Sequence, residues 1–559
     1  MATNGVHGTH IETDILVIGA GAGGLVAALS AKRAAPPATQ VTIVDSWKVG
    51  RSGHTAFSNA WTVVVAPDDD LESVTKEIIA GNDFIADQPL IHRVLETSWD
   101  RLKDLEGIGL QWPRNEDGSY YRRPTRGLKD TRVMYPVGGG LEFSWKLKRG
   151  IEDEGVQILD RFFVTGLMKG DGERVTGAVG VQSRTGEFFA ITARATIIAT
   201  NAITFRTGFV RDLTGTGTLL AYRAGAKLRN AEFSYLRPGT PRFYFEGIAF
   251  AIQDGASFVN KNDEQFMLSY EPEWGDRADV PRIARAMAME KQKGNDPLYL
   301  DMSRIDPAKR DFYFSSTVAW MQNFLDKLGD EARTDMFGKT PYYPQNQMTK
   351  MGLATDADCR SNVPGLYAAG LAQAGCCNHF AGFHIGMCIG TGWFAGEAAV
   401  KDLETLPPAK LDAAEAGALY RETMAPRDDG ANAESDNWLL EFQRFTARYD
   451  IALWKSADRL EAALQTLGGL RERFAELRAP DNHELVRIKE SEAMVLAAEI
   501  IFRASLMRQE SRMSHFREDF DFRDDDNWLA WIDVEDSGSG PVLTKTPIPT
   551  PITHPADLT

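Results

Sequence analysis

Composition and charge restrict the kind of protein that this chain can be. Its 559 residues include 78 acidic and 62 basic side chains, for a formal net charge of −16. Because nucleic acids and many membrane surfaces are also negative, this balance argues against a general nucleic-acid partner or an anionic membrane surface. Hydrophobic residues make up 43% and charged residues 25%, as in ordinary soluble domains. The length allows two to four domains with sizeable cores.

The sequence predicts neither a membrane span nor an export signal. Its apolar stretches are short and interrupted, and residues 1–12 lack the basic start and apolar centre of a signal peptide. The four cysteines form no C-x-x-C pair and no iron–sulfur spacing: Cys359, Cys376, Cys377 and Cys388. We therefore expect a reducing cytoplasm and no metal site.

A glycine-rich turn near the N-terminus predicts a dinucleotide site. An apolar run leads into Gly19-x-Gly21-x-x-Gly24, a helical segment follows over 25–35, and a second apolar run ends in Asp45. The glycines allow a tight turn, a close approach of diphosphate to the backbone and close packing of the helix on the strand. Asp45 lies where a ribose diol needs an acceptor. The alternative is a glycine-rich turn in some other α/β domain.

Periodicity along the chain gives the remaining elements. Helices are expected over 71–106, 141–154, 280–291 and 411–507, and strands over 156–160, 175–181, 188–191 and 195–200. Aromatic, proline and arginine residues interleave from about residue 232, which indicates an inserted domain. The expected units are 12–232 and 352–405 for the first domain, 233–351 for the insert, 406–535 for a helical domain and 536–559 for a disordered or partner-wrapping tail.

Several segments, in one order along the chain, resemble the flavoprotein subunits of succinate dehydrogenase and fumarate reductase. This family includes L-aspartate oxidase and the adenylylsulfate reductase α subunit. The resemblance covers about residues 12–535 and is carried by Arg51–Thr55, Gly215–Ala226, Phe258–Met267, Pro281–Met287, Arg508–Arg512, His515–Phe520 and Arg523–Leu529. It implies an α/β protein with a Rossmann-like FAD-binding domain, an inserted capping domain and a C-terminal helical domain.

The resemblance also implies FAD held in extended form beneath the cap. The residues expected to contact FAD are Gly19, Gly21, Gly23, Gly24, Asp45, Ser46, Arg51, Ser52, Gly53, His54, Thr55, Val164, Ala199, Thr200 and Gly370. In respiratory members, the histidine of Arg-Ser-His-Thr carries the flavin covalently. The loop Arg51–Thr55 has one additional glycine and also resembles the Arg-Ser-Gly loop of adenylylsulfate reductase, whose FAD is not covalent. We therefore expect non-covalent FAD, with covalent attachment through His54 as the alternative.

For catalysis, the resemblance implies hydride exchange between the flavin and a substrate carbon, with an arginine of the cap helix moving the proton. Arg282 matches that arginine's position. An arginine is normally a poor acid, because its pKa stays above about 12. Neighbouring carboxylates in a dry site could relay the proton. The alternative is a surface arginine in an ion pair.

Several positions depart from the pattern that holds a C4 dicarboxylate. Arg237 replaces a family histidine in a Phe-His-Pro-Thr-Gly segment, and residues 378–384 replace the segment that carries the substrate arginine. An arginine clamp is not exchanged for histidine without cost, so ordinary succinate or fumarate is not expected. Arg237, His379 and His384 form the expected substrate cluster. The alternative is that each is a structural residue bonded to backbone.

Two classes of function follow. The first is an FAD-dependent oxidoreductase acting on a small anionic substrate by C–C dehydrogenation or enoate reduction. The second is a non-redox, flavin-dependent hydratase or lyase acting on an activated alkene. In the first class, electrons must be exchanged with an external acceptor, because the chain has no cluster-binding cysteine set. That acceptor could be a partner subunit, a soluble carrier or oxygen. A partner subunit would make this chain one component of a larger reductase, and an oligomer is left open.

Overall fold

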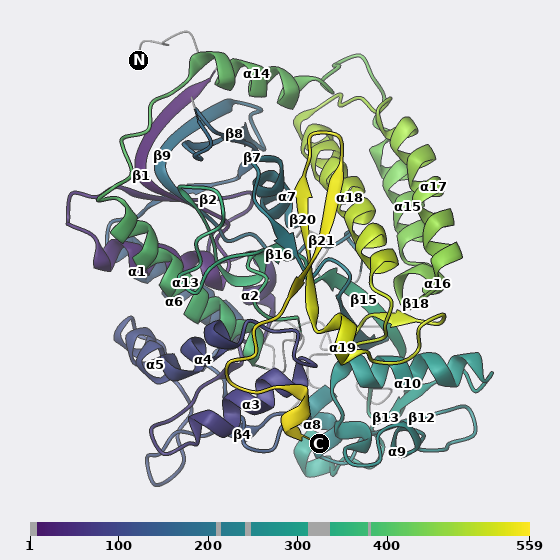
Figure 1. The fold of residues 1–559 in the computed structure, drawn as a ribbon. Helices are drawn as coiled ribbons and strands as arrows, with labels where there is room; N and C mark the ends of the chain where they lie inside the picture. The colour runs from purple at the N-terminus through teal and green to yellow at the C-terminus, as the bar shows by residue number, and fades with distance from the viewer. Residues whose placement is uncertain are drawn as a thin grey trace.

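A seven-stranded sheet forms the centre of the first domain (Figure 1). The computed structural model describes residues 8–170, 172–207, 214–240, 248–310, 336–377 and 382–558. The strand order is β6-β2-β1-β9-β8-β7, and β17 also pairs with β9. The strands are β1 (Thr9–Ile18), β2 (Val41–Asp45), β6 (Gln157–Asp160), β7 (Phe162–Met168), β8 (Gly177–Gln182), β9 (Phe188–Ile198) and β17 (Leu366–Ala368).

The parallel part of this sheet places the expected nucleotide motif at the ends of its strands. β1 runs parallel to β2 and to β9, and β17 runs parallel to the end of β9. Residues 15–18 of β1 are fully buried, which explains their unbroken apolar sequence. Since parallel strands end at one edge, the turns after β1, β2, β9 and β17 meet there.

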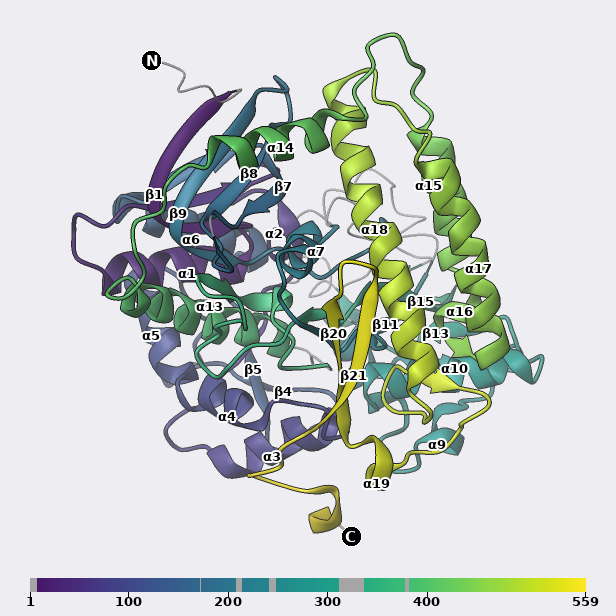
Figure 2. The ribbon, with the colours of Figure 1, turned by 45° about the horizontal axis from the view of Figure 1, so that its top comes forward.

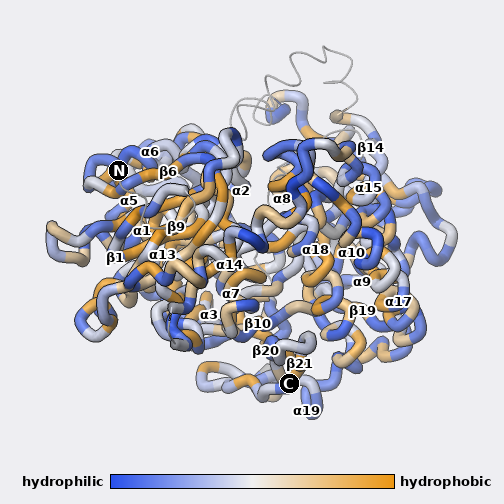
Figure 3. The backbone as a smooth tube through the Cα atoms, turned by 90° about the horizontal axis from the view of Figure 1, so that it is seen from above, coloured by the Kyte–Doolittle hydropathy of each residue, from blue (hydrophilic) through white to orange (hydrophobic). Residues whose placement is uncertain are grey.

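Helices cover the sheet faces (Figure 1). α1 (Ala22–Ala34) packs against α13 (Phe383–Asp402), and Gly392 and Gly396 make that approach possible because a Cβ on either would lie 2.5 Å from an α1 backbone oxygen. The remaining helices of this domain are α2 (Gly53–Phe57), α3 (Leu71–Gly81), α4 (Gln88–Glu96), α5 (Ser98–Gly107), α6 (Gly139–Asp153) and α7 (Thr216–Arg223). In Figure 3 the most hydrophobic backbone follows β9 and α13, in agreement with their burial.

The insert contains two small sheets and a long helix. β11 pairs antiparallel with β15, and β13 lies between β12 and β14. The expected helix over 280–291 is confirmed as α10, Val280–Gln292. The other elements are β11 (Ser234–Gly239), α8 (Ile248–Gln253), β12 (Ser257–Val259), α9 (Met267–Tyr270), β13 (Tyr299–Asp301), β14 (Lys339–Pro341) and β15 (Tyr343–Thr349).

The chain enters and leaves the insert side by side. Ser234 pairs with Thr349, and the Lys350 amide donates to the Phe233 carbonyl oxygen at 2.9 Å. These contacts lie at the expected boundaries of 233 and 351. The division into domains nevertheless stays a prediction.

The expected helical region over 411–507 is confirmed (Figure 2). α15, α17 and α18 lie together and bury a shared apolar cluster, in which the rings of Trp438 and Phe442 stack at 5.2 Å. The helices are α14 (Ala413–Met424), α15 (Ser435–Thr446), α16 (Tyr449–Ala452), α17 (Ala457–Phe474) and α18 (Asn482–Met507). No helix in the described part of the chain is both long and apolar enough to cross a membrane.

Of the two alternatives expected for residues 536–559, a disordered or a partner-wrapping tail, disorder is wrong for the described residues. β20 (Ala530–Asp536) turns back into β21 (Pro541–Pro547), and the two strands form an antiparallel hairpin with seven residue pairs. Beyond it, the Gln88 side chain donates to the Thr553 carbonyl and accepts from the Ile552 and Thr553 amides. Backbone pairing therefore orders a segment that buries few side chains. Sequence composition does not report this kind of stabilisation.

Candidate functional site

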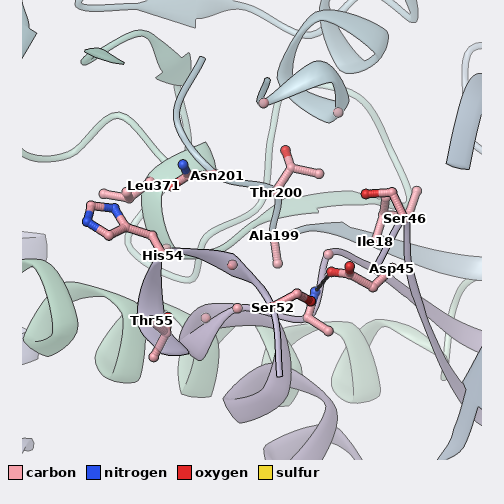
Figure 4. A pocket seen from close by; sticks show the side chains of 18 of the residues that line it. Ile18, Asp45, Ser46, Ser52, His54, Thr55, Ala199, Thr200, Asn201 and Leu371 are labelled. Carbon is pink, nitrogen blue, oxygen red and sulfur yellow. Dashed lines mark hydrogen bonds between the residues drawn. The ribbon is translucent and has the colours of Figure 1, made fainter. Parts of the chain in front are cut away.

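A long cavity opens where the parallel strands end (Figure 4). Asp45, Ser46 and Ile18 lie at one end, Ala199 and Thr200 lie midway, and His54, Asn201 and Leu371 lie at the other end. Most of the expected FAD contacts line it: Gly19, Gly21, Gly23, Asp45, Ser46, Ser52, Gly53, His54, Thr55, Val164, Ala199, Thr200 and Gly370. Gly24 and Arg51 do not.

The three motif glycines have different physical roles. Gly19 has a φ of +104°, a conformation that other residues rarely adopt. A Cβ on Gly24 would lie 1.8 Å from the Gly19 carbonyl oxygen, so Gly24 allows α1 to pack on the turn. A Cβ on Gly21 would instead meet only the Thr55 hydroxyl, at 3.8 Å, and Gly21 lines the cavity. The space beside Gly21 can therefore admit a ligand's diphosphate.

Asp45 is held in place by two backbone amides. Its Oδ2 accepts from the Ala20 amide at 2.7 Å, and its Oδ1 accepts from the Trp47 amide at 2.8 Å. Burial raises the pKa of Asp45, although both hydrogen bonds oppose that shift. Each carboxylate oxygen keeps acceptor capacity, so Asp45 can still take hydroxyl donors.

The small-residue segment after β2 forms a short helix at the other end of the cavity. His54 and Thr55 belong to α2, and Thr55 Oγ1 accepts from the Ala22 amide at the start of α1 at 3.1 Å. That hydrogen bond joins α2 to the nucleotide turn. Arg51 lies on the exposed side just before α2 and does not line the cavity.

Sequence reasoning missed several residues that line the cavity. They include Phe162, Phe163, Asn201, Thr214, Thr216, Leu220, Leu371, Ile385, Cys388 and Glu490. Glu490 comes from α18 and pairs with Arg206 at 2.5 Å. A single glutamate in a long helix gives no indication in the sequence that its side chain lines a site formed by distant segments.

A second cavity lies directly beside the first, between α2, β11 and α8. His54, Ser58, His384 and Ile385 line both cavities. The second is further lined by Asn59, Ala60, Trp61, Arg126, Tyr235, Arg237, Pro238, Ile248, Ala249, Phe250, Val280 and Gly382. The ring of Trp61 contacts that of Phe250, with centroids 4.0 Å apart. The insert therefore covers this cavity with apolar groups.

The second cavity is basic. Arg126 and Arg237 line it together with His54 and His384, and no aspartate or glutamate occurs among its described lining residues. Arg237 lies on β11 and is only 9% exposed. Asn59 Oδ1 is buried without a hydrogen-bond partner among the described residues, which is typical of a group that awaits a ligand or water. Sequence reasoning found Arg237 but missed Arg126 and Asn59.

One of the expected catalytic residues, Arg282, is not brought to these cavities. Arg282 lies on α10 and lines neither one. Its side chain is 53% exposed, and Nη1 pairs with Glu271 at 2.9 Å. Proton transfer by Arg282 stays a prediction that this arrangement does not favour. His379 lies outside the described residues.

Comparison with known proteins agrees with this geometry. A family model described as "FAD binding domain" matches residues 14–385, and one described as "Fumarate reductase flavoprotein C-term" matches 440–556. The chain belongs to the fumarate reductase and succinate dehydrogenase flavoprotein family. It is thus an FAD-dependent oxidoreductase by family, and the expected fold class is confirmed.

Relatives of this flavoprotein match it over nearly the whole chain. A component of the CoM/CoB fumarate reductase of Methanothermobacter marburgensis is 28% identical, covering 91% of this chain and 94% of that protein. A fumarate reductase flavoprotein subunit of Mycobacterium tuberculosis is 27% identical, covering 95% and 96%. A mutant FrdA chain of E. coli quinol fumarate reductase has a similar fold, with a TM-score of 0.90, 22% identity and 98% coverage of both chains.

The residues of the first cavity fit FAD. The glycine turn and Asp45 lie at one end and His54 at the other, as an extended dinucleotide requires (Figure 4). Midway, Thr200 Oγ1 and Asn201 Nδ2 are buried and have no hydrogen-bond partner among the described residues. Buried polar atoms in native structures are rarely left this way, so a bound polar ligand accounts for them.

Proposed function

We propose that this flavoprotein oxidises or reduces a C–C bond of a small organic anion other than succinate or fumarate. One observation carries the proposal. The cavity beside the FAD cavity is lined by two guanidinium groups and two imidazoles. A partly dry, basic cavity strongly favours an anionic ligand, because arginine pairs with carboxylate through two parallel hydrogen bonds.

The departures from the dicarboxylate pattern support a different substrate. Arg237 occupies the place of a family histidine, and the apolar walls include Trp61 and Phe250. These walls suit an acid with an apolar body, whereas a second carboxylate buried against them would need its own partners. Arg237 and Arg126 would bind the carboxylate, and Asn59 would accept from a substrate donor.

Bound FAD supplies the hydride chemistry at this site. The chain's own residues bind the acid, exclude water and exchange the proton. His54 and His384 line both cavities and so lie where the two ligands would meet. The aromatic cover limits water, which strengthens charge interactions inside.

Electrons would enter or leave through a partner subunit or a soluble carrier. The relative from M. marburgensis is named as one subunit of its reductase, which supports the first of these routes. The four cysteines are buried and form no disulfide, and no described group of histidine, cysteine and acidic residues could hold a metal.

The substrate class can be tested with a panel of unsaturated mono- and dicarboxylic acids and their amides. Each is added anaerobically to chemically reduced protein while flavin absorbance is recorded. An acid is expected to reoxidise the flavin, and its amide is expected to do so far more slowly. Equal rates for acid and amide, or no response to any acid, would contradict the proposal.

Asp45→Ala is expected to weaken FAD retention. The change removes a buried acceptor of a ribose hydrogen bond and also the partner of the Ala20 and Trp47 amides. The loss should amount to about 1.5–3 kcal/mol, or roughly 10- to 100-fold in Kd. Titration of apoprotein with FAD measures it, and Asp68→Ala, at an exposed position, is the control. A Kd equal to that of the parent would show that Asp45 does not contact the cofactor.

FAD is expected to be non-covalent. The additional glycine before His54 starts α2 and allows a φ of +84° at Gly53, so the imidazole need not take the position found in the shorter respiratory loop. Acid precipitation should release all the flavin into the supernatant. A yellow pellet, with the mass of FAD added to the peptide containing His54, would overturn this expectation.

A further inference from the structure

A buried lysine contacts His384, one of the two imidazoles that line both cavities. Lys350 is 5% exposed, and its Nζ lies 3.0 Å from His384 Nε2. Its ammonium also lies 4.7 Å above the Tyr235 ring, whose centroid is 5.1 Å from that of His384. Nothing in the glycine or cap-helix motifs points to Lys350, which follows β15 at the junction between the insert and the first domain.

Burial dominates the electrostatics of Lys350. Among the described residues, the titratable groups that face it are His384 and Cys388 from α13, Tyr235 from β11, Cys376 and Cys377 from the loop before α13, and Asp279 at the start of α10. Burial lowers the pKa of Lys350 to about 8, although the charges of the thiols and of Asp279 oppose that shift. Lys350 can therefore gain and lose a proton near neutral pH.

Lys350 and His384 cannot both be charged without a large cost. Their nitrogen atoms are at hydrogen-bond distance, and one of the two must offer a lone pair to the other. His384 also lies in the first turn of the 20-residue helix α13, whose positive end disfavours a second positive charge. The two nitrogen atoms therefore share one proton through this hydrogen bond.

We propose that Lys350 and His384 form the proton-transfer pair of this oxidoreductase. The inference deepens the proposed function, on which it rests. His384 lies where substrate and FAD would meet, and Lys350 returns a proton to His384 after each transfer. Arg282, which the family resemblance implies for this task, lines neither cavity and pairs with Glu271.

The proton balance is simple. In alkene reduction, the hydride and its electron pair come from reduced FAD and form one C–H bond. A second C–H bond forms as an imidazole N–H of His384 breaks. His384 regains its proton as a Lys350 N–H bond breaks, and the neutral amine is recharged from solvent. Dehydrogenation runs the same transfers in reverse.

Three variants test the pair in holoenzyme. Lys350→Met keeps the apolar stem without the amine, Lys350→Arg keeps a charge that cannot be given up, and His384→Gln keeps hydrogen bonding without titration. All three should retain FAD and lose about 10²-fold or more in turnover, the usual scale for acid–base catalysis. Lys291→Met, on the exposed face of α10, is the control and should match the parent.

The pH profile separates proton transfer from a merely electrostatic role. Reduction needs the pair protonated, so turnover of the parent should fall as pH rises through about 8, whereas Lys350→Met should lack that transition. If Lys350 only provided charge, Lys350→Arg would restore turnover. Such a rescue would overturn the proposal. The proposal would also be overturned if the turnover of Lys350→Met and His384→Gln stayed within about threefold of the parent while Arg282→Lys lost activity.

A second readout needs no substrate. Because the unfolded lysine has its ordinary pKa near 10.5, the unfolded chain binds more protons than the folded one between pH 8 and 10.5. Stability of the parent should therefore rise with pH across this window relative to Lys350→Met. Lys455, whose pKa burial lowers to about 7, contributes equally to both proteins. A constant difference in Tm across the window would overturn the proton-sharing pair, even if no acid is ever turned over.

Discussion

Arg237→Ala is expected to raise the KM for the anionic substrate by roughly 10- to 100-fold while FAD binding stays unchanged. Arg237 is almost fully buried and lines only the cavity beside the FAD cavity. Removing its guanidinium takes away one of the two charged partners that a bound carboxylate would have, at a cost of about 1.5–3 kcal/mol. Steady-state kinetics with the acid and flavin absorbance of the purified variant measure both quantities.

Two controls distinguish anion binding by Arg237 from a role in maintaining the cavity. The amide of the same substrate lacks the charge, so its KM should change little in Arg237→Ala. Arg304→Ala removes an exposed arginine of the insert that lines neither described cavity, and should behave as the parent. An equal loss for acid and amide would mean that Arg237 maintains the cavity rather than binding the anion.

Gly24→Val is expected to disrupt the nucleotide turn itself. A Cβ at this position would meet the Gly19 carbonyl oxygen at 1.8 Å and the Gly19 carbonyl carbon at 3.0 Å, and backbone atoms of this kind cannot easily move away. Overpacking of this kind costs about 3 kcal/mol or more, so the apoprotein should melt at lower temperature and retain no FAD. Thermal melting of apoprotein, followed by FAD titration, is the measurement.

Gly21→Ala is the matched variant for that experiment. Gly21 has ordinary helix-entry geometry, with φ −73°, and its added methyl would point into the cavity. Apoprotein stability should therefore stay close to that of the parent, whereas FAD affinity should fall by about 10²-fold because the methyl occupies the diphosphate's place. Unchanged FAD affinity would contradict a diphosphate at this turn.

The nucleotide end of the site could be predicted from sequence because the residues that form it lie close together along the chain. Gly19, Gly21, Gly24 and Asp45 belong to one strand–turn–helix–strand unit, and each residue's role follows from its spacing. The helices over 280–291 and 411–507 were predictable for the same reason, since apolar periodicity records the face that each one buries.

The substrate end could not be predicted in the same way. Arg237 and His384 were expected from the family resemblance, but Arg126, which lines the same cavity, and Lys350, which contacts His384, come from other segments. Only the packing of the folded chain brings them to this site. The position of Arg282 depends on the rotation of α10, which a motif does not fix. The tail was misjudged because β21 is ordered by backbone pairing with β20, which composition does not reveal.

The central claim is that this flavoprotein carries out redox chemistry on an organic anion. Anaerobic, photoreduced enzyme is mixed with an acid that the panel has identified, and flavin absorbance is recorded together with the product formed. We expect one flavin reoxidised for each saturated acid produced. Product formed by addition of water, with the oxidised flavin unchanged over many turnovers, would contradict the claim and identify a hydratase.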